Sequence, residues 1–164
     1  MAAAPDASAV DQIESRHLQT LSSSGQLVDT AERLRARLGA TPALTESELR
    51  LLVRILILRA DPSAEAALAE ANRRFPASAQ LRRLESDFYL AIRDYDRAAA
   101  ALQRLADLSP AQKVSALNAL VRLRQDQGDI KAALQAAGQI IAASPASASG
   151  YLQFADVAFA GGQA

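Results

Sequence analysis

Residues 94–110 read DYDRAAAALQRLADLSP, and residues 129–145 read DIKAALQAAGQIIAASP. Each segment begins with an aspartate, is rich in alanine, and ends at a Ser-Pro pair. The closing prolines belong to a longer series, which consists of Pro42, Pro76, Pro110 and Pro145. Its successive gaps are 34, 34 and 35 residues. A period in this range is typical of a chain built from stacked supersecondary units.

Three further series of positions share this period. Twelve residues before each proline stands a small residue, in the series Thr30, Ala64, Ala98 and Ala133. Four residues later comes the series Leu34, Leu68, Leu102 and Ala137. The last series contains Gly25, Arg59, Arg93, Gly128 and Gly162. Glycine in that series suits a helix C-terminus, because it adopts a positive φ without a Cβ clash.

Capping signals divide each period into two helices. Asp94 predicts a helix over 95–107 and Asp129 a helix over 130–143, because an N-cap carboxylate accepts hydrogen bonds from free N–H groups. The pair Asp61-Pro62 predicts another helix in the same way. Short turns between these helices indicate antiparallel neighbours. Two segments match a capping box, namely 45–48 (TESE) and 109–112 (SPAQ).

The composition favours an all-α protein. Half of the 164 residues are apolar, and most of these are alanine and leucine, which are good helix formers. Lysine plus arginine equals aspartate plus glutamate at 18 each, so the total charge lacks the basic excess of a typical nucleic-acid binder. The strongest apolar run, over 51–58, is far too short to cross a bilayer. We therefore expect neither a nucleic-acid partner nor direct membrane insertion.

Residues 1–10 are rich in alanine, proline, serine and aspartate and have no signal-peptide pattern. They are predicted to form a flexible leader, which either starts a native protein or follows a removed signal or membrane segment. Their composition favours the periplasm slightly over the cytoplasm. The absence of cysteine excludes disulfides, thiolate metal sites and cysteine nucleophiles.

A 34-residue helix–turn–helix with glycine at the inner turn and proline after the second helix resembles the tetratricopeptide repeat. The residues that carry the resemblance best are Phe88, Tyr89, Asp94, Tyr95, Ala98, Leu102 and Pro110. It implies an all-α fold, namely a right-handed superhelical α-solenoid over 11–164. It also implies that the protein is not an enzyme and needs no cofactor. The expected units are 11–44, 45–78, 79–113, 114–147 and a half unit at 148–164.

The resemblance also implies a concave wall, lined by the first helix of each unit, where such proteins bind peptides or partner proteins. Carried onto this sequence, the candidate wall residues are Leu49, Val53, Leu56 and Ile57 in the second unit, Arg83, Asp87 and Leu90 in the third, and Asn118, Arg122 and Gln125 in the fourth. The first unit offers Gln12, Ser15, Gln19 and Ser22.

Each group of wall residues has two interpretations. The aliphatic group forms an apolar groove, or Val53, Leu56 and Ile57 belong to a packed core. The group of Arg83, Asn118 and Arg122 forms a small pocket for a carboxylate, or it is an ordinary solvated face.

A few positions depart from the family pattern or need a separate explanation. Glu85 and Arg124 occupy positions where an apolar residue is expected. His17, the one histidine, falls in a core position. It has no ligand or catalytic partner at a suitable spacing, so no metal site and no catalytic residue are expected.

The last predicted helix has an apolar face at Tyr151, Phe154, Val157 and Phe159, which only one neighbouring helix would cover. We favour a fragment of a longer array over self-association through this helix. The leading functional hypothesis is a protein–protein interaction scaffold, such as a periplasmic exopolysaccharide-export or envelope-assembly factor. The alternative is a regulatory or substrate-positioning domain of a larger enzyme, such as a glycosyltransferase.

Overall fold

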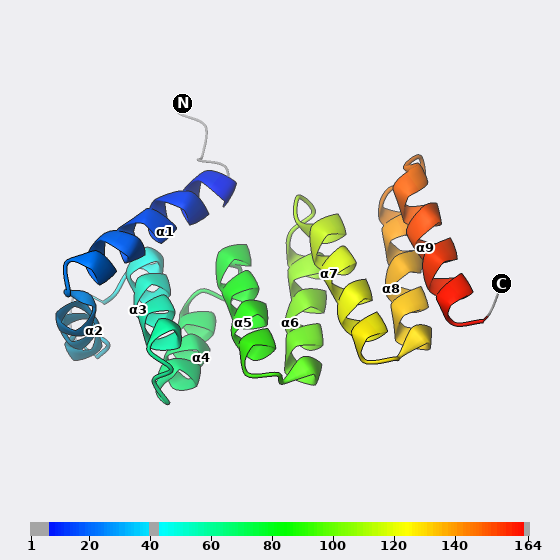
Figure 1. Cartoon of the computed structure of the whole chain (residues 1–164). Helices are drawn as coiled ribbons and strands as arrows, with labels where there is room; N and C mark the ends of the chain where they lie inside the picture. Colours follow the sequence, from blue (N-terminus) through cyan, green and yellow to red (C-terminus); the bar gives the residue numbers. More distant parts are fainter. Residues whose placement is uncertain (1–6, 40–42, 163–164) are drawn as a thin grey trace, which may run out of the picture. The chain divides into compact units, whose positions relative to one another are not determined.

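The computed structural model describes residues 7–39 and 43–162, and every regular element within these ranges is an α-helix (Figure 1). The helices are α1 (Ala7–Ser23), α2 (Leu27–Ala36), α3 (Glu46–Leu58), α4 (Ala64–Arg74), α5 (Ala79–Ala91), α6 (Tyr95–Leu108), α7 (Lys113–Asp126), α8 (Ile130–Ala143) and α9 (Ala148–Ala160). The expected all-α class is therefore confirmed. Pro42 and residues 1–6 of the expected leader lie outside the described residues, and residues 7–10 belong to α1.

The chain divides into two compact units, Met1–Leu84 and Glu85–Ala164. In the first unit, α2 packs against α3 and α3 packs against α4. In the second unit, α6 packs against α7, α7 packs against α8, and α8 packs against α9. This packing of consecutive neighbours is what an α-solenoid of helical hairpins requires.

The inner turns of four hairpins have the same hydrogen-bond pattern. A residue with positive φ donates its N–H to the carbonyl three residues back, and the next residue donates to the carbonyl five residues back. At Gly128 these bonds are 2.9 Å to Gln125, followed by 2.9 Å from Asp129 to Arg124. This is the Schellman arrangement, which satisfies free carbonyls at a helix C-terminus. The positive-φ residues of the four turns are Gly25, Ala60, Arg93 and Gly128.

One of these turns corrects the sequence prediction. The periodic series placed Arg59 at the turn before α4, whereas the residue with positive φ is Ala60, at +49°. Arg59 instead ends α3 with φ of −90°. Because α3 is one residue longer before its turn than the series assumed, all positions assigned by counting back from the turn move forward by one in this helix.

The predicted caps are confirmed at three helices. The side chain of Asp94 accepts a hydrogen bond from the N–H of Arg97 at 3.1 Å, and that of Asp129 accepts one from Ala132 at 3.0 Å. Thr45 forms the predicted capping box at α3, in which Glu48 Oε2 accepts from the Thr45 N–H at 2.8 Å.

Two predicted helix starts differ from the structure. The capping box over 109–112 is wrong, because the Gln112 N–H bonds to the Ser109 carbonyl at 3.0 Å and closes a separate turn, so α7 begins only at Lys113. Asp61 does not cap α4 directly, since the N-cap is Ser63. Its carboxylate instead accepts a hydrogen bond from the Ser63 N–H at 2.9 Å.

The small residues of the periodic series are buried at or near the start of α4, α6 and α8. Ala64 is 2% exposed, and Ala98 and Ala133 are fully buried. Similar close packing occurs between α8 and α9, where a Cβ at Gly161 would lie 2.5 Å from Cγ2 of Ile130. Larger side chains at these positions would force the helices apart.

Candidate functional site

The positive-φ residues give a register that is measured on the structure. They are Gly25, Ala60, Arg93, Gly128 and Gly162, at gaps of 35, 33, 35 and 34 residues. The candidate wall residues of the third and fourth expected repeats (79–113 and 114–147) lie ten, six and three residues before their turns. We call these three positions the wall slots. In α3 they contain Arg50, Arg54 and Ile57.

Three of the aliphatic candidates belong to the core. Leu49, Val53 and Leu56 are 0% exposed, so no partner can touch them on the folded chain. Val53 and Leu56 therefore belong to the packed core, which was the second interpretation of this group. Leu49 belongs to the core as well. Ile57 is half-buried and is the one member of this group that occupies a wall slot. The cause of the error is the one-residue difference at the turn before α4.

The remaining candidates are at least partly accessible. In the compact unit Glu85–Ala164, Asp87 and Arg122 are exposed, and Leu90 and Asn118 are half-buried. Arg83, which belongs to the compact unit Met1–Leu84, is exposed. Asn118 and Arg122 lie one turn apart on α7, so they share a face of that helix. The idea that Arg83 joins them in a carboxylate pocket stays a prediction.

Two arginines of α3 were not predicted as wall residues, because the sequence prediction took Arg59 as the turn residue. Arg50 and Arg54 occupy the wall slots of this helix, and the side chain of Arg50 is only 9% exposed. Nη2 of Arg50 forms an ion pair with Oε1 of Glu14 in α1, and Nη1 of Arg54 lies 3.6 Å from Oε2 of the same carboxylate. Recognition of Ala60 as the turn residue would have identified both arginines.

A second carboxylate extends this cluster within the first unit. Nη1 of Arg50 lies 3.2 Å from Oε1 of Glu46, one helical turn earlier in α3. The hydroxyl of Ser78 donates to the same oxygen at 2.7 Å. The arginine is therefore held from α1 and from its own helix together.

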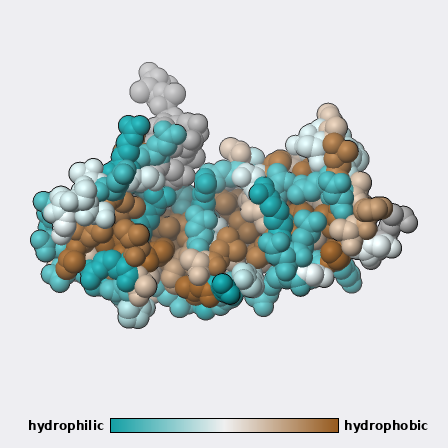
Figure 2. All heavy atoms as spheres, in the orientation of Figure 1, coloured by the Kyte–Doolittle hydropathy of each residue, from teal (hydrophilic) through white to brown (hydrophobic). Residues whose placement is uncertain are grey.

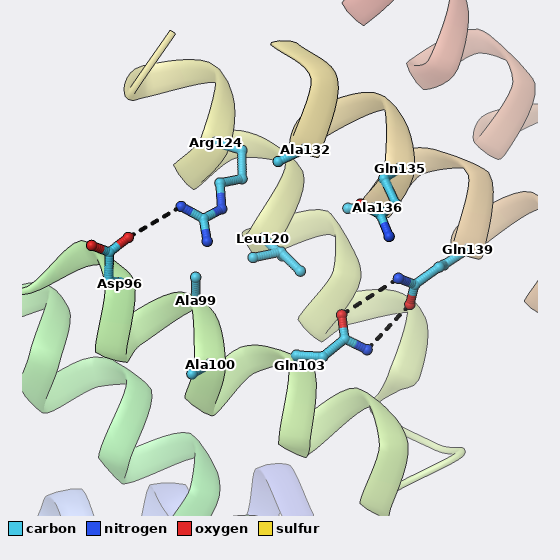
Figure 3. Close-up of a pocket in the computed structure, with 10 residues that line it drawn as sticks. All are labelled: Asp96, Ala99, Ala100, Gln103, Leu120, Arg124, Ala132, Gln135, Ala136 and Gln139. Carbon is cyan, nitrogen blue, oxygen red and sulfur yellow. Dashed lines mark hydrogen bonds and ion pairs between the residues drawn. The ribbon is translucent and has the colours of Figure 1, made fainter. Parts of the chain in front are cut away.

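A groove of about 260 Å³ lies in the second unit between α6 and α8 (Figure 3). The side chains of Gln103 and Gln139 exchange hydrogen bonds of 3.2 and 3.5 Å across it. Elsewhere along it, Arg124 lies 3.4 Å from Asp96. Leu120 and several alanines complete the apolar part of the lining. The Gln103–Gln139 pair therefore joins α6 and α8 across the groove through their own side chains.

The two polar departures from the family pattern have local partners. Glu85 is 8% exposed and accepts a hydrogen bond of 3.0 Å from Nη2 of Arg104 in α6. Arg124 is half-buried and, besides Asp96, donates to the side chain of Gln127 at 2.9 Å. Each charged group at an expected apolar position thus has a polar partner.

The turn between α5 and α6 is fixed by charge as well as by backbone geometry. Hydrogen bonds from the Arg97 side chain and backbone N–H lower the pKa of Asp94 below its ordinary value. The guanidinium of Arg97 also lies 4.5 Å from the ring centroid of Tyr89, which is a cation–π distance.

His17 is exposed rather than buried, so its expected core position is wrong. Within residues 7–39 and 43–162, no group of three or more histidine or carboxylate side chains is placed to hold a metal ion. The helices of the same ranges are too short or too polar to cross a bilayer. On the face drawn in Figure 2, hydrophobic residues form patches between hydrophilic ones.

No family model matches the sequence, and no curated protein matches it. Among solved structures, MamA has a TM-score of 0.63 at 19% identity, over 88% of this chain and 84% of that one. The pilF protein of Pseudomonas aeruginosa has a TM-score of 0.58 at 15% identity, over 93% and 70%. TTC0263, a TPR protein of Thermus thermophilus, has a TM-score of 0.52 at 19% identity, over 86% and 77%. The chain therefore has the fold of a tetratricopeptide-repeat protein.

Proposed function

We propose that this chain is a non-catalytic scaffold that binds a peptide or partner protein along the wall slots of its repeats. The observation that carries the proposal is the chemistry of these slots in the second unit. Asp87 and Arg122 occupy equivalent positions in α5 and α7, and both are exposed. Leu90 and Gln125, three residues before their turns, are both half-buried. Equivalent positions that alternate in charge and polarity suit recognition of one extended partner.

Arg122 is the strongest single candidate within this surface. It is exposed, and Asn118 lies one turn away on the same face. Guanidinium and amide groups at this spacing can bind a carboxylate or a backbone carbonyl of a partner through charge-assisted hydrogen bonds.

The proposal can be tested with a matched pair of charge reversals on the full chain. Arg122→Glu alters a wall slot, whereas Lys131→Glu makes the same change at an exposed position of α8. Proteins captured by the immobilised wild-type chain are compared with those captured by each variant, and the affinity of a purified hit is then measured. We expect Arg122→Glu to weaken binding by about tenfold or more, and Lys131→Glu to leave it unchanged. Equal binding by both variants would exclude this wall.

A finer assignment within this class is a periplasmic exopolysaccharide-export or envelope-assembly factor of a bacterium. Its support is compositional, since the array is rich in alanine, arginine, glutamine and leucine. Immunodetection of the native protein in periplasmic and cytoplasmic fractions tests it. A protein found only in the cytoplasmic fraction would contradict the envelope assignment and leave the scaffold proposal untouched.

A further inference from the structure

Two wall slots of α3, those of Arg50 and Arg54, are covered by another part of the same chain. The slots six residues before the turns of α5 and α7 hold exposed side chains, Asp87 and Arg122. In α3, by contrast, the side chain of Arg54 in this slot is 22% exposed, and Arg50, ten residues before the turn, is 8% exposed. The covering element is α1, whose Glu14 reaches both guanidinium groups.

Glu14 contacts these arginines as a ligand carboxylate would. Its two oxygens are divided between the two guanidinium groups, with Oε1 on Arg50 and Oε2 toward Arg54. Its own side chain is 14% exposed, so the contact is largely withdrawn from water. Two arginines one turn apart that converge on one carboxylate form a site selective for that group.

The remaining contact between α1 and the rest of the first unit is loose. Leu21 is the only residue of α1 whose described side chain is a buried hydrophobic one, and Ile13 is 65% exposed. A hollow of about 360 Å³ remains between α1 and α3, and His17 and Leu51 are among its lining residues. Helix α1 also meets α2 and α3 much less extensively than α3 meets α4.

The ion pair itself is incompletely satisfied. Oε2 of Glu14 and Nε of Arg50 are buried atoms without a hydrogen-bond partner. A buried ion pair gains little net free energy, because the loss of hydration offsets most of the Coulomb attraction. The described side chains of α1 add few apolar contacts to it, so we expect only a small free-energy difference to hold α1 in its docked position.

We propose that α1 is an intramolecular occupant of a carboxylate-binding site formed by Arg50 and Arg54, and that an acidic helix of a partner replaces it. The partner presents a glutamate or aspartate to the two guanidinium groups in place of Glu14. The inference rests on the proposed function, because these arginines occupy the same wall slots. It adds that the chain covers part of its own binding surface until a competing carboxylate arrives.

The test uses the full chain and a fluorescent peptide copy of α1, residues 7–23, as the acidic helix. Glu14→Gln in the chain weakens the internal occupant, and the peptide still carries its glutamate. We expect the peptide to bind this variant about tenfold more tightly than the wild-type chain, since a charge-assisted contact has become available. Glu32→Gln, an equal charge change at an exposed position of α2, is the control and should bind like wild type.

A second peptide separates carboxylate recognition from general helix binding. The peptide with its own Glu14→Gln should show no preference for the Glu14→Gln chain, and Arg54→Gln in that chain should abolish the preference of the acidic peptide. Equal binding of both peptides, or equal binding to both chains, would overturn the proposal.

Hydrogen exchange on the full chain tests whether α1 is separable. In the Glu14→Gln variant, amides of α1 should exchange faster while those of α3 keep their wild-type protection. Loss of protection in both helices would show that α1 is integral to the first unit and would refute the proposal. The Arg122→Glu capture experiment tests α7 and not α3, so a failure of the proposed function and a failure of this inference are distinguishable.

Discussion

Arg104 of α6 donates a hydrogen bond of 3.0 Å to Glu85 of α5, whose side chain is only 10% exposed. This partner explains how a carboxylate occupies a position where repeats of this type carry an apolar residue. The arginine approaches from the surface, since its own side chain is 48% exposed. The pair therefore combines a buried acceptor with a solvated donor.

Removal of the donor should cost more than removal of both groups. Arg104→Met removes the Arg104 hydrogen bond from the buried Glu85 carboxylate. We expect the free energy of unfolding to fall by about 1–2 kcal/mol, a modest loss because the arginine is partly exposed to solvent. The double variant Glu85→Leu, Arg104→Met should be at least as stable as wild type. Urea unfolding followed by circular dichroism measures both, and a double variant less stable than Arg104→Met would contradict this account.

The turn at Ala60 should be improved by glycine. A non-glycine residue in the left-handed region is strained by about 1–2 kcal/mol, and glycine loses part of this advantage through its freedom in the unfolded chain. We therefore expect Ala60→Gly to stabilise the chain by about 0.5–1 kcal/mol.

The reverse change at the equivalent turn is its natural control. A Cβ at Gly128 would meet nothing within 4 Å, so Gly128→Ala tests backbone strain alone. We expect it to destabilise the chain by about 1 kcal/mol. Chemical denaturation measures the two variants side by side, and changes of the same sign would refute the assignment of both turns.

The capping box at α3 should give a specific acid dependence. A hydrogen bond from the Thr45 backbone N–H and one from the Arg37 side chain lower the pKa of Glu48 from 4.5 to about 2. A lowered pKa stabilises the folded chain above the ordinary value, and this stabilisation disappears as the pH falls through the folded value. The stability difference between wild type and Glu48→Gln should therefore shrink between pH 4.5 and 2.

Thermal unfolding at a series of pH values measures that difference directly. Because Asp61, Glu70 and Asp94 also have lowered pKa values, wild type itself loses stability over a similar acidic range. Only the comparison with the variant isolates Glu48. A difference that stays constant with pH would show that its charge does not stabilise α3.

Neighbouring residues of α3 should respond in opposite ways to the same substitution. Leu56 is 0% exposed, so Leu56→Asp buries an unpaired carboxylate and should abolish cooperative folding. Even Leu56→Ala should cost about 2–5 kcal/mol. Ile57 is half-buried in a wall slot, and Ile57→Asp should keep the helical signal. Equal loss of helicity in both aspartate variants would place Ile57 in the core as well.

Periodic chemistry made most of the fold predictable. Asp129 and Gly128 mark the start of α8 and the end of the preceding turn because each has a local conformational role that needs no distant contact. The same reasoning failed over 109–112, where a separate turn precedes α7 and the order of residues still matches a capping box.

The wall of α3 could not be predicted because its register depends on a turn without glycine. Ala60 adopts a positive φ only because the hairpin requires it, and neither its type nor that of Arg59 reveals which residue does so. The partner of Arg50 was equally hidden, since Glu14 lies 36 residues away in the sequence and meets it only after α1 has packed. Long-range ion pairs follow from tertiary structure, whereas caps follow from sequence.

The inner turns have a consequence for the rate of folding. Arg93 and Gly128 end one helix, and the aspartate directly after each begins the next, so two adjacent residues define a whole helical hairpin. The information that builds α7 against α8 is therefore local in the sequence. Proteins dominated by such low-contact-order interactions fold in microseconds to milliseconds. We expect this chain to fold rapidly, with its hairpins as the first structures to form.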